Sequence, residues 1–162
     1  MRCIIQRVSE ASVKVENEIT GSIQTGLMIL VGFEEADTIE DLEWTCGKIV
    51  NMRIFNDENG AMPARQNDIS RSGGNLSIKE IGGNILLVSQ FTLHAQTKKG
   101  NRPSYIKAAK REIAIPLYEQ MKLMLGKEIG RKIESGIFGA DMKVSLINDG
   151  PVTIILDSKN KN

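Results

Sequence analysis

The sequence places hydroxyl and amide side chains directly after an unbroken apolar run. The run covers residues 85–88, and Ser89, Gln90, Phe91 and Thr92 follow it. Polar groups at the end of a buried strand need hydrogen-bond partners or a ligand. Two interpretations are open: the side chains bond to neighbouring strands or cap the next loop, or they orient a substrate. The local sequence alone favours the first, because binding sites are few per protein.

His94 is the single histidine of the chain. If the strand continues to residue 94, His94 shares a face with Gln90 and Thr92. Side chains two positions apart on a strand are separated by about 6 to 7 Å at their roots, whereas activation of a nucleophile needs a base within hydrogen-bond reach. We therefore predict that His94 lies at the surface or at a pocket rim, and we disfavour a Ser/Thr-His-Asp hydrolase.

Metal chemistry finds little support in the composition. One histidine and two widely separated cysteines, Cys3 and Cys46, exclude a multi-histidine site and a C-x-x-C pair. We expect both thiols to be reduced, buried and inert. No metal and no cofactor are expected.

Two other segments carry candidate residues. Residues 148–153 read Asn-Asp-Gly-Pro-Val-Thr, which is typical of a turn chosen for backbone freedom. Only about 5 to 6% of X-Pro bonds are cis, so the local sequence does not predict a special peptide geometry. Residues 97–111 hold six basic side chains and no acid. That run is either a solvated loop or a surface for phosphate groups.

Composition bounds the class of protein. The chain has 162 residues and a formal net charge of +1, with 41% hydrophobic and 25% charged residues. These values are typical of a soluble globular protein of one domain and not of a disordered chain. No apolar run is long enough to span a bilayer, and the first residues do not resemble a secretion signal. We expect a cytoplasmic protein that does not enter a membrane.

Hydrophobic periodicity predicts about eight strands and two helices. A capping pattern at Asp37 and Glu40 starts a helix that runs to about residue 51. A second helix covers residues 114–125, with Pro116 in its first turn and Gly126 as its stop. The predicted strands cover residues 2–8, 11–16, 19–23, 27–33, 75–81, 85–93, 142–146 and 152–156.

The order of these elements predicts an α+β fold. The sheets are mixed and largely antiparallel, because strands cluster rather than alternate with helices. A single domain covers residues 1–158, and the tail 159–162 should fray. Residues 63–74 form a polar, irregular loop.

Five blocks taken together resemble the D-aminoacyl-tRNA deacylase family, formerly called D-tyrosyl-tRNA deacylases. They cover nearly the whole chain in the family's order, and their joint occurrence is highly specific. The blocks are residues 1–2 together with 5–8, then 89–93, 99–103, 138–142 and 148–153.

The resemblance implies a homodimeric enzyme without a metal. It would hydrolyse the ester that joins a D-amino acid to the terminal adenosine of tRNA, and it would also accept glycine mischarged on tRNA-Ala. Such an enzyme performs chiral proofreading in translation, and its partner is the 3' end of an aminoacylated tRNA.

The family's pocket maps onto named positions of this sequence. The implied catalytic residues are Gln90, Phe91 and Thr92. The implied substrate-binding residues are Ser89, Phe138, Gly139, Ala140 and Met142, together with Gly150 and Pro151, which enter the partner subunit's pocket through a cis bond. From the basic run we expect Lys98, Lys99 and Arg102 to bind tRNA phosphates, with Arg65 and Arg71 as auxiliaries.

With the substrate that the resemblance implies, positioning of the ester can replace a protein nucleophile. An aminoacyl ester is already activated and has a neighbouring ribose 2'-hydroxyl. Backbone N–H groups around Phe91 and Thr92 would stabilise the oxyanion. Thr92 and the RNA hydroxyl are both open as the chemical participant, and RNA-assisted attack of water is favoured. Two other functions stay open: a non-enzymatic RNA-binding module that uses residues 97–111, and an esterase for small molecules.

Overall fold

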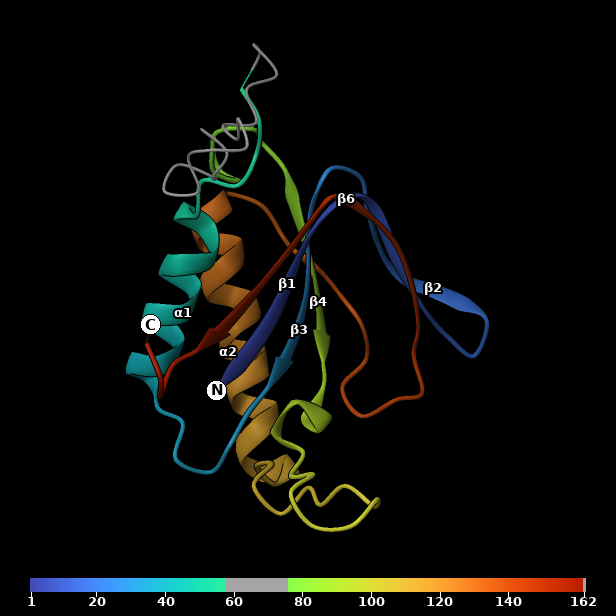
Figure 1. Cartoon of the computed structure of the whole chain (residues 1–162). Helices are drawn as coiled ribbons and strands as arrows, with labels where there is room; N and C mark the ends of the chain where they lie inside the picture. The colour runs from blue at the N-terminus through green and yellow to red at the C-terminus, as the bar shows by residue number, and fades with distance from the viewer. Residues whose placement is uncertain (58–75, 162) are drawn as a thin grey trace, which may run out of the picture.

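One long strand, β1, organises a mixed sheet (Figure 1). The computed structural model describes residues 1–57 and 76–161. Its strands are β1 (Arg2–Val15), β2 (Glu18–Ile23), β3 (Gly26–Gly32), β4 (Asn84–Ser89), β5 (Glu134–Ser135) and β6 (Lys143–Asp157). β1 pairs antiparallel with β6 along one edge, and with β3 and then β2 along the other. β4 runs parallel to β3 on one side and to β5 on the other.

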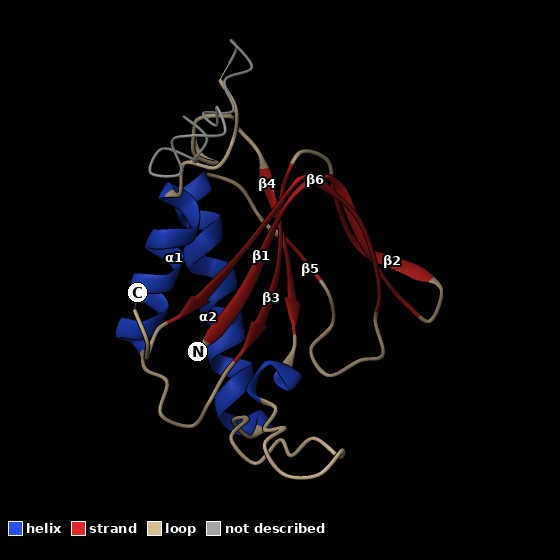
Figure 2. Cartoon of the chain, in the orientation of Figure 1, coloured by secondary structure: helices blue, strands red, loops and turns tan. Residues whose placement is uncertain are grey.

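The sheet is nearly closed, because β2 curves back toward β5. A Cβ atom added to Gly21 on β2 would lie 3.0 Å from the carbonyl oxygen of Ser135 on β5. With both α-helices on one face (Figure 2), the structure confirms a single-domain α+β fold with a mixed sheet.

The two helices, α1 (Ile39–Asn51) and α2 (Arg111–Ile129), confirm the predicted pair. The capping box of α1 lies one residue later than predicted: Thr38 is the N-cap, and its N–H donates to the Asp41 carboxylate at 2.9 Å. α2 begins at Arg111, before the predicted start, so Pro116 lies beyond its first turn, and it passes Gly126 and ends at Ile129. Its C-cap is Gly130, whose φ of 71° is left-handed. The predicted stop was wrong because a glycine can stay in a helix, whereas the left-handed position after the last turn favours one.

β4 separates two hydrophobic clusters, because alternate side chains of a strand point to opposite faces. Ile85 and Leu87 face the helices, and Leu86 and Val88 face the other cluster. All four are buried, which confirms the prediction of a strand buried on both faces.

Several predicted strand boundaries were wrong. Residues 2–8 and 11–16 form one strand, β1, and residues 142–146 and 152–156 join in β6, because β1 and β6 hydrogen-bond along nearly their whole length with local shifts of register. Residues 78–82 form turns, and Leu76 makes only an isolated bridge to Phe55. The described part of the chain therefore holds fewer strands than the eight expected.

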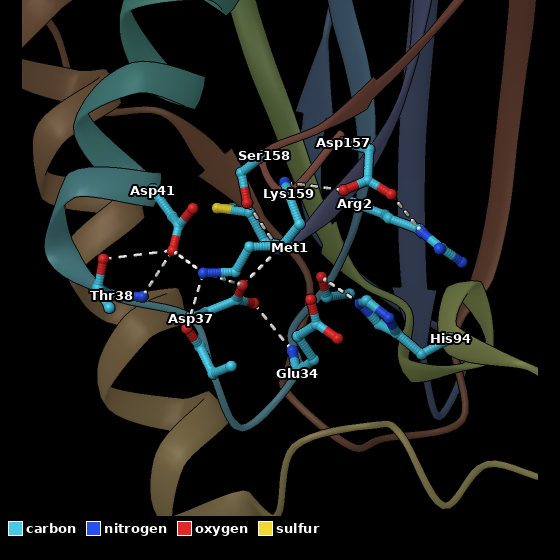
Figure 3. Close-up of polar contacts among 12 residues, drawn as sticks. Met1, Arg2, Glu34, Asp37, Thr38, Asp41, His94, Asp157, Ser158 and Lys159 are labelled. Atoms are coloured by element: carbon cyan, nitrogen blue, oxygen red, sulfur yellow. Dashed lines mark hydrogen bonds and ion pairs between the residues drawn. The ribbon is translucent and has the colours of Figure 1, made fainter. Parts of the chain in front are cut away.

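The chain ends meet beside the start of α1 (Figure 3). The α-ammonium group of Met1 ion-pairs with Asp37 and donates to the Ser158 hydroxyl at 2.8 Å. Lys159, the first residue of the predicted tail, donates to Asp41 at 2.6 Å and to the Ala36 carbonyl at 2.7 Å.

Three other sequence predictions concern cysteines, loops and membranes. Cys3 and Cys46 are free and buried, as expected, and burial raises the pKa of the Cys46 thiol to about 12. The loop at 63–74, with Arg65 and Arg71, lies outside the described residues. Within the described residues, no helix has the length and apolar character that crossing a membrane requires.

Candidate active site

A cavity of about 640 Å³ opens where β4 ends. Its walls come from the residues after β4, the start of α2 and the loop that precedes β6. Seven residues that the sequence analysis assigned to a pocket line it: Ser89, Gln90, Phe91, Phe138, Gly139, Ala140 and Met142. Two segments about fifty residues apart in sequence therefore share one cavity, whose volume is in the range of small-ligand sites.

Gln90 and Thr92 are joined directly. The Gln90 side-chain amide donates to the Thr92 hydroxyl at 2.5 Å, and the Gln90 backbone N–H donates to the Val31 carbonyl at 2.7 Å. Thr92 lies next to the lining residues rather than among them. The pair can present the remaining amide and hydroxyl groups to a ligand in a fixed orientation.

The prediction of a strand through residue 93 was wrong, because the chain turns at Gln90 into a short 3₁₀ helix, Phe91–His94. Gly32 allows this turn to pack against β3. A Cβ atom at Gly32 would lie 2.7 Å from the Gln90 carbonyl oxygen, which is closer than unbonded atoms approach. Gln90, Thr92 and His94 would share one face only if the strand continued to residue 94, and it does not.

The prediction that His94 lies at a surface or rim was also wrong. Its side chain is only 3% exposed, and its Nε2–H donates to the Gly32 carbonyl at 3.0 Å (Figure 3). Arg2 donates to the Leu93 carbonyl at 3.2 Å in the same region. His94 and Arg2 thus hold the 3₁₀ helix against the sheet, and His94 is not placed as a base for Thr92.

Phe138 is held on the opposite wall by α2. Its ring packs edge-on against Tyr118, with centroids 5.6 Å apart, and the Tyr118 hydroxyl donates to the Leu87 carbonyl at 2.8 Å. Gly139 follows in a left-handed conformation with φ of 74°. This turn brings the wall residues toward the end of β4.

The polar and aromatic residues of the cavity that the sequence analysis missed include Tyr105, Arg111 and Asp141, besides Phe33 of the strand predicted at 27–33. The first two belong to the basic run at 97–111, which indicated phosphate binding but not a place in the pocket. Tyr105 packs edge-on against Phe91, with ring centroids 5.1 Å apart. Only the tertiary contact between the loop and the 3₁₀ helix joins them.

Gly150 and Pro151 lie away from the cavity of their own chain, within β6. The bond between them is cis, as the family resemblance implied, and both residues are exposed. The interpretation of residues 148–153 as a turn was wrong. The neighbouring Asp149 carbonyl accepts a hydrogen bond from the nearly buried Arg7 at 2.9 Å.

Comparison with known proteins decides the family. A sequence model described as D-Tyr-tRNA(Tyr) deacylase matches residues 4–157, nearly the whole chain. The chain belongs to the D-aminoacyl-tRNA deacylase family. It is therefore an enzyme, a hydrolase that acts on ester bonds.

Relatives in this family match the chain over nearly their full length. D-aminoacyl-tRNA deacylases of Flavobacterium johnsoniae and Bacteroides fragilis are each 60% identical to it, and each match covers 99% of both chains. A solved structure titled "c-Myc DNA Unwinding Element Binding Protein" is 37% identical, with a TM-score of 0.84 over 97% of this chain and 98% of that one. A probable eukaryotic D-amino acid tRNA deacylase is 17% identical, with a TM-score of 0.77 over 96% and 97%, and shows the fold alone.

The basic residues predicted to bind tRNA lie on a loop beside the cavity. Gln96 and Ser104 exchange backbone hydrogen bonds of 2.8 and 3.0 Å and close the loop. Lys98, Lys99 and Arg102 are exposed on it, and no ion pair joins any of them to another described residue. Lys98 and Lys99 also line a second hollow of about 390 Å³.

Metal ligands are not gathered anywhere in the described part of the chain. No group of three or more His, Cys, Asp or Glu residues there could hold an ion. The residues around the cavity supply hydrogen bonds, aromatic faces and one guanidinium group instead.

Proposed function

We propose that the chain hydrolyses the ester bond of D-aminoacyl-tRNA in the 640 Å³ cavity. Water adds to the ester carbonyl, the bond to the terminal ribose oxygen breaks, and free tRNA and a D-amino acid leave. One observation carries this assignment: Gln90 and the wall around Phe138, two of the segments by which the chain resembles its family, line the same cavity.

The chemistry relies on placement rather than on a protein nucleophile. The N–H groups of Phe91 and Thr92 belong to the first turn of the 3₁₀ helix, where helix geometry leaves donors without a partner inside the helix. Donors of this kind stabilise a developing oxyanion. Gln90 and Thr92 orient the ester, and the ribose 2'-hydroxyl assists the attack of water. The buried His94 bonds to a backbone carbonyl, which supports a mechanism without a histidine base.

The active form is a homodimer in which Gly150 and Pro151 enter the pocket of the partner subunit. Both residues are exposed in the isolated chain. The sheet face opposite the helices also carries apolar side chains that stay partly exposed: Leu30, Val144 and Leu146 on the strands, with Met142 just before β6. Apolar surface of this kind is what a second copy would cover.

Selection against L-amino acids follows from that arrangement. Backbone carbonyl oxygens of the partner's Gly-Pro segment receive the α-ammonium group of the substrate. A D side chain then projects toward the mouth, whereas an L side chain meets the segment, so exclusion is steric. Glycine has no side chain to exclude, so glycyl-tRNA is also a substrate.

The acceptor end of tRNA binds the loop that carries Lys98, Lys99 and Arg102, in the cytoplasm where translation takes place. A phosphate contact makes affinity depend on salt and not on nucleotide sequence. The triple alanine variant of these residues should therefore bind tRNA less tightly, with a shallower dependence of log affinity on log salt. An unchanged slope would show that the loop is only a solvated surface.

The proposal is tested by the amino acid released from four substrates: a D-aminoacyl-tRNA, glycyl-tRNA, the matching L-aminoacyl-tRNA and a simple D-amino acid ester. We expect turnover of the first two and negligible turnover of the third. Equal hydrolysis of the D and L forms would overturn the exclusion. Preference for the simple ester over the tRNA ester would make the chain a small-molecule esterase.

A binding function without catalysis is the second candidate, because the loop is basic and one solved relative is titled as a DNA-element-binding protein. The chain has only 4% aromatic residues for stacking on bases. Tight binding of uncharged tRNA with no release of amino acid from any ester would favour this candidate.

A further inference from the structure

Arg111 places an unpaired positive charge in the wall of the cavity. It is the first residue of α2 and lines the cavity beside Gly139. A Cβ atom on Gly139 would lie 3.3 Å from Nη2 and 3.5 Å from Cζ of Arg111. The guanidinium group therefore lies across the Gly139 backbone, in space that a larger residue at position 139 would fill.

No described residue neutralises this charge. Asp141 lines the same cavity, but its carboxylate pairs with Lys143 at 2.9 Å. No hydrogen bond or ion pair joins the Arg111 guanidinium group to any other described side chain or backbone group. A cation at the N-terminus of a helix is also unfavourable, because the helix dipole is positive there. The five N–H donors of the Arg111 side chain can therefore all bind a ligand. Within the described residues, no ion pair lets this charge stabilise the fold.

Arg111 lies at the mouth of the cavity rather than on its floor. The floor is formed by buried residues such as Val31, Val88 and Ala114. Phe91 is 56% exposed, Tyr105 is 40% exposed, and Arg111 is exposed as well. These three side chains border the opening through which a polymer attached to a bound ester must leave.

The covalent structure of the proposed substrate determines which anionic group lies at the mouth of the cavity. If the ester carbonyl is held by the Gln90 and Thr92 end of the cavity, the terminal adenosine fills the space between that end and the mouth. The next group of the substrate is the phosphodiester that joins the last two nucleotides. Arginine is suited to such a group, because its planar donors can bind two phosphate oxygens at once.

We propose that Arg111 binds the phosphate group that joins the last two nucleotides of the aminoacylated tRNA. The proposal rests on the proposed function, since it takes the substrate to be a tRNA ester held in this cavity. It makes Arg111 a binding residue that selects nucleotide esters over simpler esters. Gly139 contributes by leaving the guanidinium group room against the wall.

The test compares three esters of the same neutral D-amino acid, D-tyrosine: on tRNA, on the dinucleotide cytidylyl-adenosine and on adenosine. Only the first two contain the phosphate in question. Arg111→Gln should lower kcat/KM about tenfold for these two, through KM, and leave the adenosine ester unchanged. Arg111→Lys should restore part of the loss. The control is Lys127→Gln, an exposed cation in the last turn of the same helix.

Each other outcome overturns the inference in a distinct way. An equal loss on all three esters would mean that Arg111 shapes the pocket or acts on the ester itself. A loss on tRNA but not on the dinucleotide would place its contact farther along the RNA. A loss confined to D-aspartyl esters, measured in parallel, would assign Arg111 to the amino-acid side chain. No activity of the wild-type chain on any ester would instead refute the proposed function, whatever Arg111 does.

Discussion

At the scale of single residues, catalysis should depend most on the hydrogen-bonded pair of Gln90 and Thr92. We predict that Gln90→Ala and Thr92→Ala each lower kcat about 10²- to 10³-fold, because an oriented hydrogen-bond donor at a reacting carbonyl stabilises the transition state by several kcal/mol. The free energy of unfolding should change little, since the strand before them is stabilised by buried apolar residues. Gln24→Ala, at an exposed position between β2 and β3, is the control. Full activity of both variants would place the site elsewhere.

We predict that His94 contributes directly to stability and only indirectly to catalysis. His94→Phe keeps an aromatic ring but removes the N–H that donates to the Gly32 carbonyl. Loss of a buried hydrogen-bond partner costs about 1 to 3 kcal/mol, so the urea midpoint should fall. The turnover number should fall as well, because the 3₁₀ helix that carries Thr92 loses an anchor. An unchanged midpoint would show that the bond contributes nothing to folding.

At the scale of elements, two glycines make a matched pair for the packing of the 3₁₀ helix. Gly32→Ala adds a Cβ atom 2.7 Å from the Gln90 carbonyl oxygen, whereas Gly47→Ala in α1 meets no atom within 4 Å. The first substitution should shift the turn and lower both stability and kcat. The second should stabilise the chain by up to about 1 kcal/mol, because alanine favours helix more than glycine does. Thermal unfolding and deacylation rates check both. Equal behaviour of the two variants would contradict this account of the turn.

The start of α1 should make stability depend on pH in the acid range. Burial alone would raise the pKa of Asp41, but hydrogen bonds from Lys159, Thr38 and Ser158 outweigh it and hold the pKa well below its usual value. A carboxyl group whose pKa is lower in the folded state contributes its full stabilisation at a pH above its unfolded pKa of about 4. This contribution decreases as the pH falls below that value.

Asp41→Asn should therefore lower the free energy of unfolding at neutral pH and flatten its decline on acidification. Urea unfolding between about pH 2 and pH 7 measures both effects. Glu43→Gln, at an exposed position of the same helix, is the control. A constant difference between wild type and Asp41→Asn across this range would refute the assignment.

At the scale of the whole molecule, the proposed exchange of Gly150 and Pro151 between subunits can be tested by complementation. One variant carries Gln90→Ala in its pocket and the other carries Pro151→Ala in its β6 segment. Each homodimer should be nearly inactive. A mixed dimer regains one complete pocket, because a two-fold interface lets each chain supply what the other lacks. Random mixing should therefore restore about a quarter of wild-type activity. Activity that stays at the level of the separate variants would mean that each chain uses only its own residues.

Local patterns were sufficient for the elements whose burial is regular. The apolar run at 85–88 predicted a strand buried on both faces, and the stripe that includes Leu42, Cys46 and Ile49 predicted α1, because period and burial are linked within one element. The five blocks of family resemblance went further. They named residues from distant segments that the structure places in one cavity.

Contacts between elements decided the rest. The strand after Ile85 ends at Ser89 because Gly32, on another strand, leaves room for a turn. β6 continues through Gly150 and Pro151 because β1 offers hydrogen bonds on both sides of them. Arg111 enters the cavity wall because α2 begins beside the loop around Gly139. The sequence by itself thus determined the fold class, the two helices and the family, which depend on local periodicity and on the order of motifs. The tertiary structure alone decided where strands stop and which side chains share a cavity, because these depend on atoms that lie far apart in the chain.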